Sequence, residues 1–296
     1  MKVLYVHGIA QEGKDPAELK KKWDAALQEG FDAAEVKWPA GMETVFSYYG
    51  DMLAEKTAEV DKGEAMGLIK RGTTESEDAQ KSEFYAEMLT EMAKSRGVPI
   101  KGLTSEDGKP VKRGIQNWPF VLALARHLSK VGAVADWTID TFTRDVWVYL
   151  RHFTVQQPID EIVDQKIPNA EPCVVVSHSL GTVIAYNVLM AREPRNNVVA
   201  WFTLGSPLGT EAVYKRIPRH YAKVIPRSAP DGVGSWYNAR DKDDIVALHP
   251  VPKSSFAGSP AVTNANHVVN TTSNQHGIEG YLSDAKVARR IAKAAT

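Results

Sequence analysis

The stretch Cys173–Tyr186, CVVVSHSLGTVIAY, contains an apolar run, a polar cluster and a helical pattern in immediate succession. The run CVVVS is rich in β-branched residues, which is typical of a buried strand, and the pattern from Thr182 onward is helical. Ser177 and Gly181 are small enough for the close backbone approach that a sharp turn requires. The sequence therefore predicts a strand, a tight turn and a helix, with the hydroxyl of Ser179 presented at the turn.

This arrangement resembles the nucleophile elbow of the α/β-hydrolase superfamily, which is written G-x-S-x-G and lies between a strand and a helix. In SHSLG, Ser177 stands in place of the first glycine. A serine hydroxyl is a poor nucleophile at neutral pH, so it needs a base beside it and donors for the oxyanion. The resemblance implies that Ser179 is the nucleophile of a serine hydrolase in the esterase and lipase-like branch. The alternative interpretation is an ordinary strand followed by a helix that a serine caps.

The composition is that of an ordinary globular protein, with 296 residues of which 43% are hydrophobic and 24% charged. The 36 basic and 36 acidic side chains cancel, so net charge gives no reason to expect a nucleic acid or an anionic membrane as partner. No apolar window approaches 18 residues and no leader pattern opens the chain, so we expect no membrane span and a cytoplasmic location. Cys173 is the single cysteine and cannot form an intramolecular disulfide.

Strand and helix patterns indicate an α/β core at both ends of the chain. Lys2–Val6 reads as a buried strand, and residues 34–39, AEVKWP, read as a second one. Between them, Asp15 followed by proline predicts the start of a helix. Further strand patterns begin at Val198 and Trp236, and the chain ends on a helical pattern. This succession predicts an α/β fold with a mostly parallel sheet flanked by helices, as in the α/β-hydrolase superfamily.

The middle of the chain is helical in pattern and has almost no strand signal. We therefore assign residues 1–42 and 168–296 to the catalytic core, and residues 43–167 to a helical insertion before the nucleophile strand. The clearest helical stripe within it covers residues 139–153. In the superfamily such insertions commonly form a cap over the nucleophile, which implies that Met88 and Phe153 line a substrate pocket. The alternative is that these apolar stripes only pack on one another and on the sheet.

The superfamily places an acidic residue after a later strand than the nucleophile. The segment RDKDDIVALHP, which follows the strand pattern at Trp236, contains Asp241, Asp243 and Asp244. Relatives often carry the acid as Asp-x-Val, and Asp244 followed by Ile-Val fits that pattern best. Asp241 is the alternative acid, because it is closer to the end of the strand. The simpler interpretation is that all three are solvated loop carboxylates.

The superfamily takes its catalytic histidine from near the C-terminus. The candidates after the elbow are His220, His249, His267 and His276. His276 lies in a polar, glycine-bearing loop before the last helix, as it does in many relatives, whereas His267 alternates with apolar residues as in a strand. We therefore predict that His276 takes the proton of Ser179 and that Asp244 fixes the tautomer of its ring.

The oxyanion requires two backbone donors. The resemblance implies that one is the N–H of Leu180, directly after the nucleophile. Lipase-like relatives take the second from a His-Gly loop after an early strand, which here is His7-Gly8, so the N–H of Gly8 or Ile9 is the candidate. His7 and His178 are predicted to contact the substrate, although His178 also fits a residue that packs beside the sheet. The simpler interpretation of His7-Gly8 is a strand that ends at a glycine.

Together these features predict a carboxylic-ester hydrolase that works through an acyl-enzyme on a small-molecule ester. The alternatives are an acyltransferase, an amide or peptide hydrolase with the same three residues, and a non-catalytic binding protein on this fold. The chain has no G-x-G-x-x-G after a strand, no G-x-x-x-x-G-K-[ST], no H-E-x-x-H and no zinc-spaced Cys/His cluster. We therefore expect neither a metal ion nor an organic cofactor. Nothing in the sequence specifies the natural ester or the oligomeric state.

Overall fold

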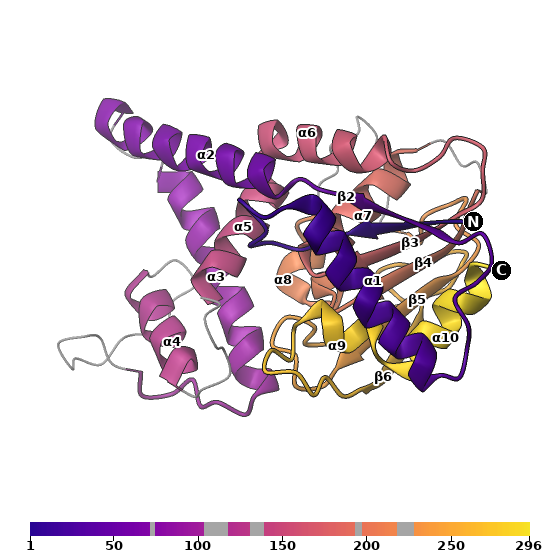
Figure 1. The fold of residues 1–296 in the computed structure, drawn as a ribbon. Helices are drawn as coiled ribbons and strands as arrows, with labels where there is room; N and C mark the ends of the chain where they lie inside the picture. The colour runs from indigo at the N-terminus through magenta and orange to yellow at the C-terminus, as the bar shows by residue number, and fades with distance from the viewer. Residues whose placement is uncertain (72–74, 104–117, 131–138, 193–196, 218–227) are drawn as a thin grey trace.

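The computed structural model has a six-stranded sheet, all parallel, with strand order β2-β1-β3-β4-β5-β6 (Figure 1). It describes residues 1–71, 75–103, 118–130, 139–192, 197–217 and 228–296. The strands are β1 Lys2–Val6, β2 Glu43–Ser47, β3 Cys173–His178, β4 Val198–Leu204, β5 Trp236–Asp241 and β6 Thr263–Val268.

Ten α-helices accompany these strands in the described residues. They are α1 Pro16–Ala33, α2 Gly50–Arg71, α3 Glu75–Ser95, α4 Trp118–Lys130, α5 Ile139–Arg151, α6 Phe153–Asp164, α7 Leu180–Ala191, α8 Glu211–Tyr214, α9 Ile278–Leu282 and α10 Ala285–Ala294. The expected α/β class, with a sheet flanked by helices, is confirmed. None of the helices in the described ranges has the combination of length and apolar character needed to cross a membrane.

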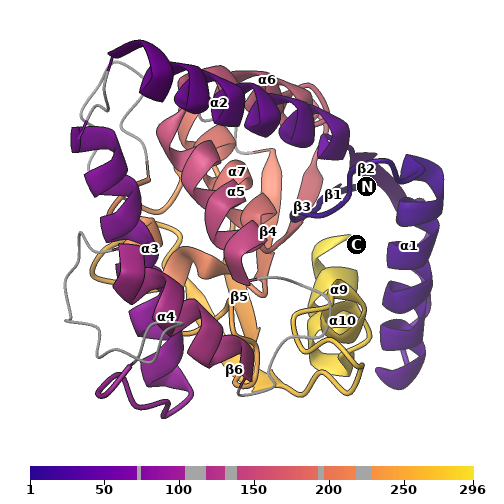
Figure 2. The same ribbon diagram turned by 90° about the vertical axis from the view of Figure 1, so that its left-hand side faces the viewer.

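Helices cover both faces of the sheet, so the molecule has three layers (Figures 1 and 2). Helices α1, α9 and α10 pack on one face, where their apolar side chains meet Val3 and Tyr5 of β1. Helices α2 to α7 pack on the other face, where they meet Leu4 and Val6 of the same strand. Successive side chains of a strand point to opposite faces, and both faces are buried here. This is why β1 and β3 are continuous apolar runs with no alternation.

The start of α1 follows directly from its sequence. The Asp15 side chain accepts hydrogen bonds from the backbone N–H groups of Ala17 (2.7 Å) and Glu18 (3.0 Å). Pro16 occupies the first turn, where its missing N–H costs nothing. The helix start predicted at Asp15 is therefore confirmed, and its buried face includes Trp23, which packs against the sheet.

The second strand is not where the sequence pattern placed it. Residues 34–39 form no strand, and Glu35 has a positive φ of 56°, a conformation that does not continue an extended chain. The sheet instead takes β2 from Glu43–Ser47, which pairs with β1 in parallel register. This strand lies inside the range that we assigned to the helical insertion. The helical part therefore begins only at Gly50.

The stripe over residues 139–153 does not form one helix. It divides into α5, which ends at Arg151, and α6, which begins at Phe153. His152 separates them because its backbone is extended, with φ −109° and ψ 107°. The two helices can therefore run in different directions, and Phe153 lies at the start of α6 with 46% of its surface exposed.

Helix α3 is fastened to the sheet's loops by polar contacts. The carboxylate of Glu91 accepts hydrogen bonds from the N–H groups of Glu211 (2.9 Å) and Ala212 (2.8 Å), which caps the start of α8. One turn earlier on α3, Glu87 pairs with Arg216 at 2.5 Å. Arg96, after the end of α3, donates to the backbone carbonyl of Asp243. These contacts hold α3 against segments that follow β4 and β5.

Candidate active site

The strand-to-helix turn at Ser179 has the predicted form. Ser179 follows β3 and directly precedes α7, with φ 55° and ψ −130°. A non-glycine residue rarely adopts a positive φ, and such strain is common at functional positions. The hydroxyl of Ser177, which replaces the usual glycine, donates to the carbonyl of Phe202 and accepts from the indole N–H of Trp201, both at 2.9 Å. This serine is therefore bound to β4 and does not crowd α7.

Two glycines allow the end of β1 to lie directly against this turn. A β-carbon on Gly181 would collide with the carbonyl groups of Val6 and His7. A β-carbon on Gly8 would lie 2.7 Å from the Cβ of Ser179 and 3.2 Å from its Oγ. No side chain fits at either position without moving the turn. The backbone that follows β1 is therefore in van der Waals contact with the hydroxyl-bearing residue.

Two of the three predicted oxyanion donors, Leu180 and Gly8, lie at this turn. Leu180 is the first residue of α7, so its N–H is one of those that lack an acceptor within the helix. The start of the helix also carries partial positive charge, which favours an anion there. Gly8 touches Ser179, as described above, and Ile9 is buried with its carbonyl accepting from the Gln11 side chain at 2.8 Å. A donor role for these groups stays a prediction.

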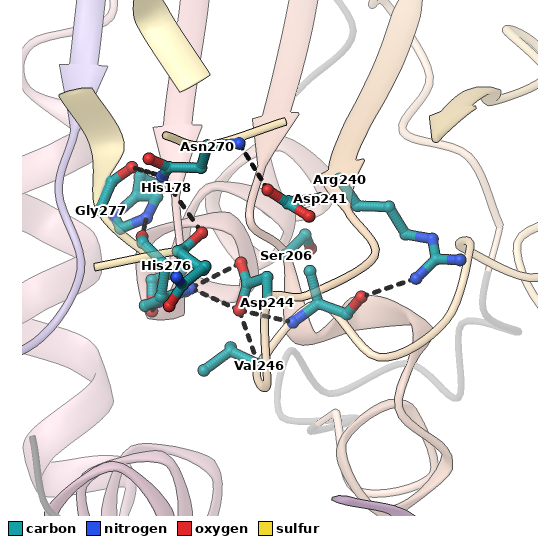
Figure 3. A network of polar contacts seen from close by, with 12 residues as sticks. His178, Ser206, Arg240, Asp241, Asp244, Val246, Asn270, His276 and Gly277 are labelled. Atoms are coloured by element: carbon teal, nitrogen blue, oxygen red, sulfur yellow. Dashed lines mark hydrogen bonds and ion pairs between the residues drawn. The ribbon is translucent and has the colours of Figure 1, made fainter. Parts of the chain in front are cut away.

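Ser179, His276 and Asp244 form one chain of hydrogen bonds. The Oγ of Ser179 lies 2.8 Å from Nε2 of His276, and Nδ1 of the same ring lies 2.8 Å and 3.0 Å from the two carboxylate oxygens of Asp244. Figure 3 shows the Asp244 carboxylate directed at the His276 ring. An ionised carboxylate can only accept, so Nδ1 carries the proton and Nε2 is free to accept the proton of the serine hydroxyl. All three residues are buried, with Ser179 only 1% exposed.

The Asp244 carboxylate has a full set of donors. Besides His276, it accepts from the N–H of Val246 at 2.7 Å and Ala247 at 3.2 Å, and from the hydroxyl of Tyr281 at 2.7 Å. Burial by itself would raise the pKa of Asp244. The facing His276 ring and the hydrogen bonds outweigh burial, so the pKa of Asp244 is held below its ordinary value. Asp244, the last member of this chain of hydrogen bonds, is therefore an ionised carboxylate.

Asp241, the alternative acid, is directed elsewhere. Its carboxylate accepts from the N–H of Asp243 at 2.7 Å. It also accepts from the N–H of Asn270 at 2.5 Å (Figure 3). The Asn270 side chain in turn donates to the carbonyl groups of Gln275 (3.1 Å) and Gly277 (2.8 Å), on either side of His276. Asp241 thus fixes the loop that carries His276, while Asp244 contacts the ring itself.

The other candidate histidines lie apart from Ser179. His267 is on β6, with its Nε2 3.3 Å from the carboxylate of Asp284. His249 is half exposed and its Nε2 lies 3.8 Å from Glu91. His220 lies outside the described residues. The structure therefore brings His276, and not His267 or His249, to the serine.

His178 supports His276 from behind. Its Nε2 donates to the backbone carbonyl of His276 at 2.7 Å, and the two rings lie 4.7 Å apart between centroids. Trp23 packs edge-on against the other side at 6.3 Å. Burial, and secondly the neighbouring His276, lower the pKa of His178 to about 3. These contacts are those of a residue that packs beside the sheet and holds the loop that carries His276.

His7 holds the loop that contains Gly8. Its Nε2 accepts from the N–H of Tyr49 at 3.1 Å, so Nδ1 is the protonated nitrogen and donates to the Gly8 carbonyl at 2.6 Å. The ring stacks on Tyr49 at 3.9 Å and on Phe46 at 5.5 Å, and it is 1% exposed. Burial lowers the pKa of His7 to about 4. These contacts show that His7 fixes the backbone of this loop, and the substrate contact predicted for it stays a prediction.

The two buried histidines predict a loss of stability in mild acid. In the unfolded chain each imidazole binds a proton near pH 6.5, whereas in the folded protein His7 and His178 bind one only near pH 4 and pH 3. Protons therefore favour unfolding as the pH falls below 6.5. The free energy of unfolding should fall by about 1.4 kcal/mol per pH unit for each histidine between pH 6 and pH 4. Guanidinium titrations at several pH values measure this slope.

The control for this prediction is a matched pair of variants. His178→Gln keeps an N–H for the His276 carbonyl and removes one ionisable group, so it should flatten the slope. His249→Gln removes a half-exposed histidine and should leave the slope unchanged. Equal slopes in His178→Gln and the parent protein would contradict the prediction.

The contact between the insertion and His276 is made by a residue that the sequence did not single out. The ring of Phe142, on α5, lies edge-on to His276 with centroids 6.5 Å apart, and it is fully buried. Met88, on α3, is also fully buried in the core shared by α2 to α7, while Phe153 is partly exposed. The pocket roles of Met88 and Phe153 stay predictions. Phe142 belongs to the same helical stripe as its neighbours, so no local signal distinguishes it.

Tyr281 is the other residue whose role the sequence did not reveal. Its hydroxyl donates to Asp244 and accepts from the N–H of Asp241 at 3.0 Å, so it ties the two aspartates together. Burial, followed by the charge of Asp244, raises the pKa of Tyr281 well above its ordinary value, which keeps the hydroxyl protonated. An aromatic residue five positions after His276 was visible in the sequence, but its hydrogen-bond partners were not.

The described residues combine an all-parallel six-stranded sheet between helical layers with a buried Ser-His-Asp chain of hydrogen bonds. The three side chains of that chain lie in the segments that follow β3, β5 and β6. Comparisons with protein-family models, with curated proteins and with solved structures found no match. The geometry of the site is therefore the basis for a functional assignment.

Proposed function

We propose that the protein is a serine hydrolase of the α/β-hydrolase type, which cleaves a small carboxylic ester through an acyl-enzyme. The observation that carries this proposal is the chain of hydrogen bonds from Ser179 through His276 to Asp244 on a strained strand-to-helix turn. Three polar side chains from distant parts of the sequence are buried together in the order and tautomer that serine activation requires. The positive φ at Ser179 adds support, because backbone strain of this kind is common at functional positions.

The first half of the reaction forms the acyl-enzyme. The Oγ of Ser179 attacks the ester carbonyl carbon while its proton passes to Nε2 of His276. The imidazolium that forms is stabilised by the Asp244 carboxylate, which stays ionised. The carbonyl oxygen becomes an oxyanion and accepts from the N–H of Leu180 and from Gly8 or Ile9. The tetrahedral intermediate then breaks its bond to the alcohol oxygen, which receives the proton from His276.

The second half regenerates the enzyme. Water attacks the acyl carbon and gives its proton to Nε2 of His276, and the same backbone N–H groups donate to the second oxyanion. Cleavage of the acyl bond to Ser179 releases the carboxylic acid and returns the proton to Oγ. Atoms and charges balance without a metal ion or a redox partner. Amide hydrolysis and acyl transfer would use the same residues. They differ from ester hydrolysis only in the leaving group, which is an amine, or in the acyl acceptor, which is an alcohol.

Active-site labelling tests the proposal. A fluorophosphonate probe phosphonylates a serine only if a neighbouring base activates it, so we expect stoichiometric labelling of Ser179 and none in Ser179→Ala. Ser177→Ala is the matched control, because Ser177 is two residues away and hydrogen-bonded to β4. Ser179 should still be labelled in this variant. p-Nitrophenyl esters of increasing chain length, assayed on the same proteins, measure turnover and acyl preference. A parent protein that neither reacts with the probe nor hydrolyses any of these esters would exclude the proposal and favour a binding protein.

A further inference from the structure

A basic groove of about 560 Å³ lies between the outer strands β5 and β6 and helix α10. Its strand side is lined by Tyr237, Thr263, Asn264, Ala265 and His267, and its helix side by Lys286, Arg289, Arg290 and Lys293. The chain as a whole has equal numbers of acidic and basic side chains. Four cations on one wall of a single groove are therefore a local excess of positive charge that the overall composition hides.

No carboxylate of the described residues forms an ion pair with any of the four cations. Asp284, which starts α10, is already engaged: it accepts from the N–H groups of Lys286 and Val287 at 2.9 Å and lies 3.3 Å from His267. Like charges three and four residues apart on a helix repel one another and destabilise it. The spacing on α10 therefore brings like charges together, and an anion in the groove would offset their repulsion.

Two of the cations are held in place. The guanidinium of Arg290 lies over the ring of Tyr237, 4.5 Å from its centroid. Arg289 donates from Nη2 to the backbone carbonyl of Ala34 at 2.7 Å, which ties α10 to the end of α1. A fixed guanidinium loses little entropy when it binds an anion, and its planar fork matches the oxygen atoms of a phosphate. These contacts give the groove ordered donors in addition to charge.

We propose that this groove binds a phosphate-bearing anion with at least two negative charges. The phosphate belongs to a soluble phosphate ester or to the headgroup of a phospholipid, which present the same oxygen atoms to the arginines. The groove runs along β6 from Thr263 to His267 beside α10, and its lining includes none of Ser179, Asp244 and His276. The ligand is thus not the ester that we propose is hydrolysed, and this inference does not depend on the proposed function.

Calorimetric titration with inorganic pyrophosphate at low salt tests the proposal. We expect saturable binding to the parent protein, weakened at least tenfold when Arg290→Gln and Lys293→Gln are combined. The control combines Lys21→Gln with Lys22→Gln, exposed positions on α1 that remove the same charge outside the groove; its affinity should stay within about threefold of the parent. Pyrophosphate should also raise the melting temperature of the parent protein but not of the groove variant.

Vesicles distinguish the two sources of phosphate. Sedimentation with phosphatidylcholine vesicles that contain a quarter phosphatidic acid, against phosphatidylcholine alone, tests a lipid headgroup. If the parent protein binds the acidic vesicles and the groove variant does not, the ligand is a lipid headgroup. If the parent protein binds pyrophosphate but not the vesicles, the ligand is a soluble phosphate ester. The proposal is overturned if neither probe binds, or if both double variants weaken binding equally. Ester hydrolysis should be the same in all these proteins, so failure here leaves the proposed function untouched.

Discussion

Replacing Asp244 by asparagine should lower kcat for ester hydrolysis by about 10⁴-fold while the protein remains folded. The Nδ1 atom of His276 donates to this carboxylate. An amide at position 244 can present its NH₂ group to Nδ1, and the proton of the ring then moves to Nε2. The nitrogen that faces Ser179 becomes a donor and cannot take the hydroxyl proton. KM should change little, because Asp244 is buried behind His276.

Asp241→Asn is the matched comparison for this prediction. Asp241 is as buried as Asp244 but bonds to the N–H groups of Asp243 and Asn270. We expect it to cost about 1–3 kcal/mol of stability, because one of those donors faces an NH₂ group, and to lower kcat far less than Asp244→Asn does. Tyr281→Phe removes the hydrogen bond to Asp244 and the acceptor of the Asp241 N–H but keeps the Asp244 charge, so it should lose roughly tenfold in kcat. A loss of 10⁴-fold in Asp241→Asn alone would reassign the acid.

Gly8→Ala should lower kcat by about 10²- to 10³-fold, the loss typical of a disabled oxyanion site. The added methyl carbon would lie 2.7 Å from the Cβ of Ser179, closer than two carbon atoms can approach. Either the loop after β1 or the nucleophile must shift, and both carry groups of the proposed reaction. Gly8 does not have a positive φ, so alanine causes no backbone strain of its own there. The damage should therefore come from the contact with Ser179.

Gly13→Ala, further along the same loop, provides the control. Gly13 has φ +69° and open space around its missing side chain, so alanine there strains the backbone without touching the site. It should cost about 1 kcal/mol of stability with kcat unchanged. Steady-state kinetics and thermal melts of the two variants separate the effects. Unchanged kcat in Gly8→Ala would show that the groups after β1 take no part in catalysis.

Local sequence signals were sufficient where short-range physics decides the structure. The β-branched run of β3, followed by small residues around Ser179, predicted the strand, the turn and the helix, because backbone approach is limited by side-chain size. The Asp15 cap predicted the start of α1, because its side chain accepts from backbone N–H groups only two and three residues later. The strand predicted at residues 34–39 was wrong. The pairing that forms β2 at Glu43–Ser47 depends on β1, and it leaves no mark in the local pattern.

By itself, the sequence determined the α/β class and the candidates for a Ser-His-Asp arrangement, because residue type and spacing limit which strands, turns and acid–base groups can form. It favoured Asp244 over Asp241 only on a short local pattern, because the two are three residues apart in one acidic loop. The tertiary structure decided between them, since only there do the loops after β5 and β6 meet, and His276 faces one carboxylate and not the other. The positive charges of α10 are already close together in the sequence, at positions 286, 289, 290 and 293, but only the tertiary structure places them opposite β5 and β6 and so forms a groove.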